Sequence, residues 1–393
     1  MAQPLEGVTV VSIEQAVSAP FATRQLADLG ARVIKIERPD GGDFARSYDL
    51  TVLGMSSYFV WLNRSKQSLT LDLKQPEALT VLDRLVERAD VFVQNLGPGA
   101  VDRLGLGLLD LRARHPRLIT CAISGYGSLG PYAGKKAYDM LIQAEVGLVS
   151  ITGTPEAPSR AGISVADIAA GMYAYSGILT ALLSRATTGL GTAIEVSLFD
   201  ALAEWMGAPA YYTAYGGVEP TRSGASHATI APYELFVSED EEEIYLAIQN
   251  DREWGRFCEQ VLERSDLTQD PRFVSNAMRV LHRPVLHALI AESFAGMAAA
   301  VIIARLDGAG IASARRNTVD GFLLHPQLVE RERWHSIDSP AGRIRALMPP
   351  VQMEGVEPVF GPVPALGQHT DQILGELGFD AEAMEGWRKE KMI

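Results

Sequence analysis

Short β-branched segments alternate with helical patterns through the first 125 residues of the 393-residue chain. VTVVSI is followed by PFATRQLADLG, in which a proline stands near the expected helix start and a glycine marks its end. Strands that alternate with helices at this spacing are typical of a parallel sheet with helices on its faces. The sequence therefore predicts an α/β fold with a Rossmann-like parallel sheet, whose ligands bind beyond the carboxyl ends of the strands.

The turn after the first expected strand argues against a dinucleotide ligand. It reads EQAVSAP (Glu14–Pro20) and contains no glycine, whereas a pyrophosphate at the helix N-terminus needs the close approach that G-x-G-x-x-G permits. The later NLGPGAVDRLG (Asn95–Gly105) is a turn rather than that fingerprint. We therefore expect a Rossmann-like sheet that does not bind NAD.

The character of the sequence changes twice after this region. Residues 137–206 read as helices rich in small residues, which permit close packing between helices. PYELFVSEDEEEIYLAIQ then predicts a hairpin whose turn is the acidic run Glu239–Glu243. We expect a large domain over 1–227, a smaller α+β domain over 228–330, and a segment over 331–393 that returns to the large domain.

Charge and residue counts limit the partners and the location. The chain has 35 basic and 48 acidic residues, a net charge of −13, so we expect neither nucleic acid nor a membrane as partner. Cys121 and Cys258 make no disulfide framework, and no residue spacing fits a metal site. MAQPLEGVTVV does not resemble a signal peptide and no apolar run reaches ~18 residues, which indicates a cytoplasmic protein. An anionic ligand stays compatible with this charge if a few cations gather locally.

Asp167 is the carboxylate that stands out. It lies in GISVADIAAGMYAYSGILTALL, a segment of otherwise apolar and small residues. An ionisable group on such a face is costly unless it is paired. Asp167 is therefore either the N-cap of a helix that begins at Ile168 or a reactive carboxylate, and a cap position would expose it to a cleft.

Several motifs occur in a fixed order along nearly the whole chain. They are LADLGARVIKIERPDGGDFAR (Leu26–Arg46), NRSKQSLTLDLK (Asn63–Lys74), VFVQNLGPGAVDRLGL (Val91–Leu106), ISGYGSLGPYAGKKAYDMLIQAEVGLVSITG (Ile123–Gly153), DIAAGMYAYSGILTALLSRATTGLGTAIEVSLFDAL (Asp167–Leu202) and PALGQHTDQILGELG (Pro364–Gly378). Together they resemble family III of the CoA-transferases, the group of formyl-CoA transferase and carnitine CoA-transferase. Within the family, the chain is most similar to the branch that uses C4–C5 dicarboxylates such as succinate, mesaconate and itaconate.

The resemblance implies that Asp167 is the catalytic nucleophile. In the family this aspartate attacks the thioester carbonyl of an acyl-CoA, which gives a mixed anhydride and CoA thiolate. The thiolate then forms an aspartyl-CoA thioester, and an acceptor carboxylate takes the CoA. Coenzyme A is thus expected as a substrate, with no tightly bound cofactor and no metal.

The resemblance also implies a set of CoA-binding residues. Arginines and lysines among them would meet the phosphates through charge-assisted bonds, although Lys74 and Lys136 could equally be solvated surface lysines. Val17 stands where formyl-transferring members carry glutamine, which argues against formyl-CoA or oxalate as substrate. The residues that match by motif are Val17, Arg38, Leu73, Lys74, Asn95, Leu96, Arg103, Lys136 and Tyr138.

A dicarboxylate acceptor has a remote carboxylate that requires a cation or another polar partner. Gln15, Arg46, Arg222 and His227 are the candidates for this substrate contact. Two of them have structural alternatives. Arg46 could form a surface salt bridge with Asp43 or Asp49, and His227 could be a hydrogen-bonded loop residue.

Other activities and assemblies remain open at this point. Transfer of CoA between two carboxyls of one substrate, such as mesaconyl-CoA, is an alternative, as is a carnitine-type acceptor. The 2-methylacyl-CoA racemase branch has a histidine before the aspartate of the KKAYD motif, whereas this chain has Tyr138 there. A CoA-binding scaffold without activity is disfavoured by Asp167. The family further implies a homodimer in which two ring-shaped subunits interlock.

Overall fold

The computed structural model describes residues 3–393, which form two compact units. The first unit comprises the residues up to Val146, Ala161–Gly207 and Val329–Ile393. The second comprises Gly147–Arg160 and Ala208–Leu328. The second unit therefore starts about twenty residues before the expected boundary at 228 and includes a short earlier segment as well.

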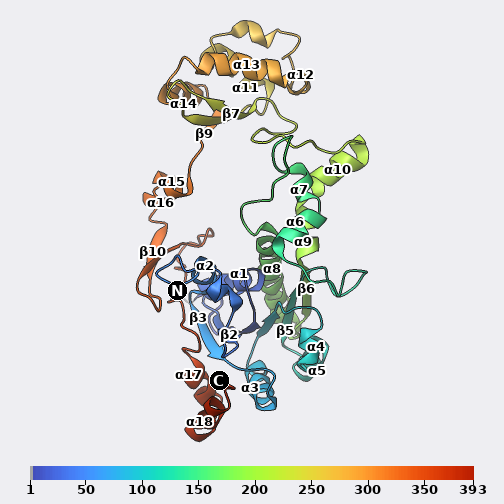
Figure 1. Cartoon of the computed structure of the whole chain (residues 1–393), viewed down its shortest axis with the longest axis vertical. Helices are drawn as coiled ribbons and strands as arrows, with labels where there is room; N and C mark the ends of the chain where they lie inside the picture. Colours follow the sequence, from blue (N-terminus) through green and yellow to red (C-terminus); the bar gives the residue numbers. More distant parts are fainter. Residues whose placement is uncertain (1–2) are drawn as a thin grey trace. The chain divides into compact units, whose positions relative to one another are not determined.

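A six-stranded parallel sheet forms the centre of the first unit (Figure 1). The predicted parallel α/β architecture is confirmed. The strands lie in the order β3-β2-β1-β4-β5-β6, so the order reverses between β1 and β4, where such sheets bind ligands. The strands are β1 (Thr9–Ile13), β2 (Arg32–Glu37), β3 (Lys66–Thr70), β4 (Val91–Gln94), β5 (Ile119–Ser124) and β6 (Ala193–Ser197).

One strand of this sheet corrects the sequence prediction. Residues 137–206 were expected to be helical, but Ala193–Ser197 is β6, which pairs in parallel with β5. Ile194 and Val196 are β-branched and alternate with other residues, a pattern that fits a strand. The strand also gains its hydrogen bonds from β5, a partner about 70 residues earlier in the chain.

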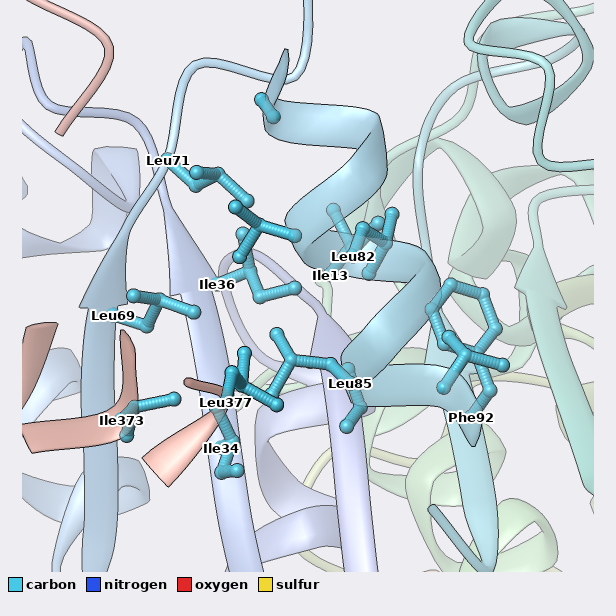
Figure 2. Packing of buried hydrophobic residues seen from close by; sticks show 14 of the residues in the cluster. Ile13, Ile34, Ile36, Leu69, Leu71, Leu82, Leu85, Phe92, Ile373 and Leu377 are labelled. Atoms are coloured by element: carbon cyan, nitrogen blue, oxygen red, sulfur yellow. The ribbon is translucent and has the colours of Figure 1, made fainter. Parts of the chain in front are cut away.

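Apolar side chains pack between one face of the sheet and α3 (Pro76–Glu87). Figure 2 shows Ile13, Ile34 and Ile36 from the strands close to Leu82 and Leu85 from α3. The C-terminal segment contributes to the same cluster through α17 (Thr370–Glu376), which carries Ile373 and Leu374. The last 65 residues therefore belong structurally to the sheet near the N-terminus.

Helix α8 (Val165–Thr188) packs against α1 (Ser18–Asp28), α6 (Asp139–Glu145) and α9 (Leu198–Trp205). Among residues 3–393, α8 is the single helix long and apolar enough to cross a membrane, and the bent pair of α13 (Arg283–Phe294) and α14 (Ala299–Gly308) passes the same test jointly. A core helix of a soluble protein also meets this criterion. The remaining elements of the first unit are η1 (Phe44–Ser47), α2 (Ser57–Asn63), α4 (Ala100–Arg103), α5 (Leu108–Arg114), the antiparallel pair β10 (Trp334–Ile337) and β11 (Ile344–Leu347), and α18 (Ala381–Lys389).

The second unit contains a three-stranded antiparallel sheet with helices around it. The predicted hairpin is confirmed, since β7 (Tyr233–Val237) pairs with β8 (Glu243–Ala247), although Glu243 is already part of β8. β9 (Ala312–Arg315) completes the sheet. The other elements are α7 (Leu148–Ile151), α10 (Gly207–Gly216), α11 (Asp251–Arg256), η2 (Phe257–Val261), η3 (Ser265–Thr268), α12 (Asn276–Leu281), α15 (Val319–Leu323) and α16 (Pro326–Val329).

Candidate active site

A cavity of about 140 Å³ opens at the carboxyl ends of β1, β2, β3 and β4. Isoleucine and leucine side chains line it, together with the exposed cations Arg38 and Lys74 and the acidic residues Glu14, Glu37, Asp43 and Asp72. Its position at the reversal of strand order is the one that parallel sheets use for ligands. The cavity brings together five of the residues that the sequence singled out, namely Gln15, Arg38, Leu73, Lys74 and Leu96.

A tight loop after β2 shapes one wall of this cavity. The backbone at Gly42 has a φ of 69°, and a Cβ there would meet Glu37 Oε1 at 2.7 Å and Leu366 Cδ1 at 2.8 Å. Only glycine fits this position without a shift of its neighbours. The Gly42 carbonyl accepts a hydrogen bond from Arg38 Nη2 at 3.4 Å, so the loop also restricts Arg38.

The turn between β1 and α1 is fixed by side chains from other strands. Asn95, directly after β4, accepts a bond from Gln15 N at 2.9 Å and donates to Gln15 O at 2.8 Å and to Ser18 Oγ at 3.1 Å. Asp43 Oδ1 accepts from Ala16 N at 3.0 Å. These bonds hold Ala16 at a φ of 61°, a left-handed conformation that raises the backbone energy of any residue with a Cβ. The side-chain amide of Asn95 thus stabilises the turn. Val17, in the same turn, is buried at the start of α1 and does not line the cavity.

Asp167 occupies the third position of α8, within its first turn. The expectation that Asp167 caps a helix beginning at Ile168 is wrong, because α8 begins at Val165 and Ser164 is its N-cap. The Ser164 side chain makes no capping bond. Instead, Asp139 Oδ1 accepts from Ala166 N at 2.7 Å and from Asp167 N at 3.3 Å. A carboxylate from α6 therefore satisfies two of the N-terminal amides of α8.

The surroundings of Asp167 disfavour its charged form. Loss of hydration, followed by the negative charge of Asp139, raises the pKa of Asp167 to about 7, against a smaller opposing effect of a hydrogen bond from Ser18. A carboxyl whose pKa lies near neutrality is a common feature of catalytic sites. Asp167 can hence change protonation state within the physiological range.

Aromatic side chains border the same region. Tyr48, just after η1, has a pKa raised to about 12, chiefly by loss of hydration and then by the charges of Asp43 and Asp167 and by Tyr138. Its ring lies against Tyr58 and Phe44, with centroids 5.5 and 5.7 Å away. Tyr138, the N-cap residue of α6, is 66% exposed. Tyr48 thus stays neutral at every physiological pH.

Arg103 and Lys136 lie at exposed positions outside the cavity lining. Arg103, the last residue of α4, donates only a long bond to Pro98 O at 3.4 Å. Lys136 belongs to the loop after β5, which is anchored on one side by Ser128 bonded to Glu195 and on the other by Lys135 bonded to Glu145. This loop thereby keeps a defined path while Lys136 points into solvent.

The candidate acceptor residue Arg46 has a buried partner. Its Nε and Nη2 atoms donate to the two oxygens of Glu37 at 2.8 and 2.7 Å, and its guanidinium lies 3.7 Å from the centre of the Phe59 ring. The alternative of a surface salt bridge with Asp43 or Asp49 is wrong, because Glu37 from β2 is the partner. Its guanidinium therefore has fewer donors left for a substrate.

Arg222 and His227 lie in the second unit. Arg222 donates to the carbonyls of Thr154, Ser150 and Pro155 at 2.9 to 3.2 Å. His227 stacks on Tyr233 with centroids 5.2 Å apart, and its Nδ1 accepts from Thr229 N at 3.2 Å. Arg222 thus ties its loop to the segment 150–155, whereas His227 stabilises its own loop, and the Nε2 face of the exposed His227 remains for other contacts.

Three residues near Asp167 were missed in the sequence. Ser18 carries a weak signal, since it stands before a proline at a helix start. Asp139 directly follows Tyr138 in the KKAYD motif, but its contact with residues 166 and 167 depends on the packing of α6 on α8. Tyr48 carries no recognisable signal. No group of three or more potential metal ligands occurs within 3–393.

Comparison with known proteins places this geometry in context. Residues 5–370 match the family model "CoA-transferase family III". The chain is 33% identical over 390 residues to succinyl-CoA:glutarate CoA-transferase of Mus musculus (98% of this chain, 88% of the relative). It is 32% identical to succinyl-CoA:mesaconate CoA-transferase of Haloarcula hispanica (95% and 96%). A solved CAIB/BAIF family protein from Brucella suis has a TM-score of 0.83 at 33% identity (96% and 100%). The chain therefore belongs to family III of the CoA-transferases and is an enzyme of that family.

Proposed function

We propose that this enzyme moves CoA from a succinyl-CoA-like donor to a small dicarboxylate, with Asp167 as the nucleophile. The observation that carries the proposal is Asp167 itself, a carboxyl in the first turn of α8 whose pKa is raised to about 7. A group of this kind retains basicity and nucleophilicity that an ordinary surface aspartate lacks.

The proposed reaction passes through two kinds of acyl-enzyme. An Asp167 oxygen attacks the thioester carbon, the C–S bond breaks, and CoA leaves as its thiolate, so that a mixed anhydride of Asp167 and the donor acid remains. The thiolate attacks the aspartyl carbonyl, which releases the donor acid and leaves an aspartyl-CoA thioester. The acceptor carboxylate attacks that thioester, which releases the CoA thiolate and forms a second mixed anhydride, between Asp167 and the acceptor. The thiolate then attacks the acceptor acyl carbon of this anhydride, which gives the new CoA thioester and restores Asp167. Each step exchanges one acyl bond for another of similar energy, so no external energy source is required.

The cavity at the strand ends is the proposed site for the nucleotide end of CoA. Its aliphatic walls suit the faces of an adenine ring, and Arg38 and Lys74 at its rim suit phosphates. These two cations are exposed, so they can reach a bound anion while the chain as a whole carries a charge of −13. We also propose Asn95 as a contact to CoA near the turn that it holds.

The choice of a dicarboxylate acceptor rests on the relatives, which act on glutarate and mesaconate by name. Of the candidate residues, Gln15 has the best support because it lies on the turn that leads from β1 to Ser18, whose hydroxyl bonds Asp167. Arg222 and His227 remain proposals for the remote carboxylate. Arg46 is the weakest candidate, since Glu37 already engages its guanidinium.

The experiment that tests this function is a CoA-exchange assay. Purified enzyme is incubated with succinyl-CoA and, in turn, glutarate, mesaconate, citramalate, itaconate or oxalate, and the new CoA thioester is measured. We expect transfer to at least one C4–C5 dicarboxylate and loss of at least 10³-fold in kcat for Asp167→Asn. Exchange that persists in Asp167→Asn contradicts the mechanism.

Two further arms of the assay separate the alternative reactions. Mesaconyl-CoA alone, without a free acid, reports intramolecular transfer by formation of its isomer. A 2-methylacyl-CoA in deuterated water reports α-proton exchange, the reaction of a racemase, for which Tyr138 would have to replace a histidine.

We further propose that the enzyme acts as an interlocked homodimer of ring-shaped subunits in the cytoplasm. The supporting observation for a dimer is α8, whose most apolar stretch is less than half buried within its own chain and which exposes Met172 and Tyr173. Such a surface is typical of a partner interface. Light scattering on the purified enzyme should give twice the chain mass of 42.5 kDa. A monomer of full activity contradicts this proposal.

A further inference from the structure

We propose that Asp139 is a positioning residue for the transfer reaction, because its carboxylate fixes the backbone of Asp167 and places a second negative charge beside it. This inference rests on the proposed role of Asp167 as the nucleophile. It gives a function to a residue that lies outside the lining of the cavity.

The contacts of Asp139 join three segments around the nucleophile. One oxygen accepts from the amides of Ala166 and Asp167, and the other accepts from Gln143 Nε2 at 2.7 Å. Gln143 is fully buried, and its Oε1 accepts from Ala161 N at 2.9 Å. The carboxylate of Asp139 is consequently held at both oxygens, so it determines where the first turn of α8 begins.

This arrangement also decides which hydrogen bonds Asp167 can make. The N-terminus of a 24-residue helix offers unpaired amides that stabilise a carboxylate and reduce its basicity. Asp139 occupies two of these amides. The Asp167 side chain is therefore left with the hydroxyl of Ser18 as its stabilising contact.

The neighbouring charge favours acylation of the nucleophile. The groups that face Asp167 are Asp139 from α6, Tyr48 after η1 and Ser18 from α1, and the negative charge of Asp139 raises the pKa of Asp167. Two adjacent carboxylates repel each other. Conversion of Asp167 to an anhydride or a thioester removes its charge and relieves this repulsion. Asp139 thus raises the energy of the free carboxylate relative to the acyl-enzyme.

The test compares Asp139→Asn with the wild-type enzyme across pH. Asparagine keeps an oxygen that accepts from Ala166 N and Asp167 N, but it removes the charge. We expect the acidic limb of the kcat profile to move to lower pH by about one unit, and kcat at pH 8 to fall by roughly tenfold or more as the nucleophile becomes less basic. The KM for acyl-CoA should change less than about threefold, because the proposed CoA cavity does not include Asp139.

Matched variants separate charge from structure. Asp110→Asn removes an exposed carboxylate from the first turn of another helix, α5, and should leave the profile unchanged. Asp139→Ala removes the acceptor as well as the charge, so its kcat should fall below that of Asp139→Asn. If neither Asp139 variant folds, carboxyl ¹³C NMR of the wild type should show Asp167 titrating near pH 7, well above the ordinary pKa of an aspartate.

The outcomes distinguish this inference from the function on which it rests. An Asp139→Asn enzyme with an unmoved acidic limb overturns the inference, as does a wild-type Asp167 carboxyl that titrates at the ordinary pKa of an aspartate. Absence of any acyl adduct on Asp167 in the turning-over wild type overturns the proposed function and this inference together. An adduct in the wild type with an unmoved limb in Asp139→Asn overturns the inference alone.

Discussion

The surroundings that raise the pKa of Asp167 also lower the stability of the folded chain at neutral pH. Its pKa is raised to about 7 in the folded chain, whereas an aspartate in an unfolded chain has a pKa near 3.9. The folded state therefore binds a proton more tightly than the unfolded state. Folding stability is unaffected below pH ~4, falls as the pH rises from ~4 to ~7, and stays reduced above that range.

Asp167→Asn should accordingly stabilise the enzyme at neutral and alkaline pH while it abolishes transfer. At pH 8 we expect the free energy of unfolding to rise by on the order of 1–3 kcal/mol, because the neutral amide escapes both desolvation and repulsion by Asp139. The gain should shrink toward pH 4. Urea unfolding at the two pH values measures it, with Asp110→Asn as the control, and a variant less stable than wild type at pH 8 contradicts the account.

The sequence predicted the role of Asp167, but not the partner of Arg46 or the role of Asp139. Asp167 was recognisable because a carboxylate is out of place among small apolar residues. The partner of Arg46 was not recognisable, because Asp43 and Asp49 are the nearest acidic residues in the sequence, whereas the actual partner, Glu37, lies on β2. The role of Asp139 depends on a contact across about 27 residues, which no local pattern reports.

At the scale of elements, the site depends on how closely α8 approaches α1. A Cβ on Gly171 of α8 would lie 2.6 Å from Ser18 O and 3.1 Å from the Phe21 ring. Gly171 lies four residues after Asp167 on α8. The absence of a side chain at Gly171 therefore permits the close contact with α1 that places Ser18 beside Asp167.

Gly171→Ala should weaken both the fold and the reaction. Overpacking at this contact is expected to cost about 1–3 kcal/mol, even though alanine is the better helix former, and kcat should drop as Ser18 and Asp167 move apart. Gly386→Ala in α18 is the matched control, because its Cβ would meet nothing within 4 Å. Thermal unfolding and the CoA-exchange assay report the two effects. Equal behaviour of the two variants would show that the close approach is unimportant.

The alternation of strands and helices predicted the sheet and its parallel direction, but not the full strand set. β6 was missed because its five residues precede a helix and read as part of it. The strand order could not be read from the pattern either, since β1 pairs with both β2 and β4 through long crossovers. The site at the reversal of strand order emerges only from that pairing.

In the molecule as a whole, a buried cluster of equal numbers of cations and carboxylates adds nothing to the net charge of −13. Lys35 bonds Asp43 at 2.7 Å, Lys66 bonds Glu14 at 2.6 Å, and Arg46 pairs with Glu37. Three cations and three carboxylates thus join β1, β2 and β3 to the loop after β2. Arg38 and Lys74 lie outside this cluster, exposed at the cavity rim, where they can meet an anion, although Arg38 Nε also lies 3.8 Å from Asp40 Oδ1.

Glu37→Gln tests the contribution of this cluster. Bonds from Arg46 and Ser68 and the charge of Lys35 outweigh desolvation and hold the pKa of Glu37 at about 2. Its stabilisation is complete above pH ~4.5 and is lost as the pH falls through ~2. We expect Glu37→Gln to lose about 3 kcal/mol at pH 7 and less below pH 4. Glu376→Gln, which removes the half-exposed partner of Arg32, should cost less than ~1 kcal/mol. Equal losses in urea unfolding would contradict the burial argument.

The central claim is that Asp167 carries CoA covalently between donor and acceptor. The most direct measurement is mass spectrometry of the enzyme after incubation with succinyl-CoA, trapping with hydroxylamine and proteolysis. We expect an aspartyl hydroxamate on the peptide that contains Asp167, formed with succinyl-CoA and absent in Asp167→Asn. An enzyme that turns over while its Asp167 peptide stays unmodified would contradict it.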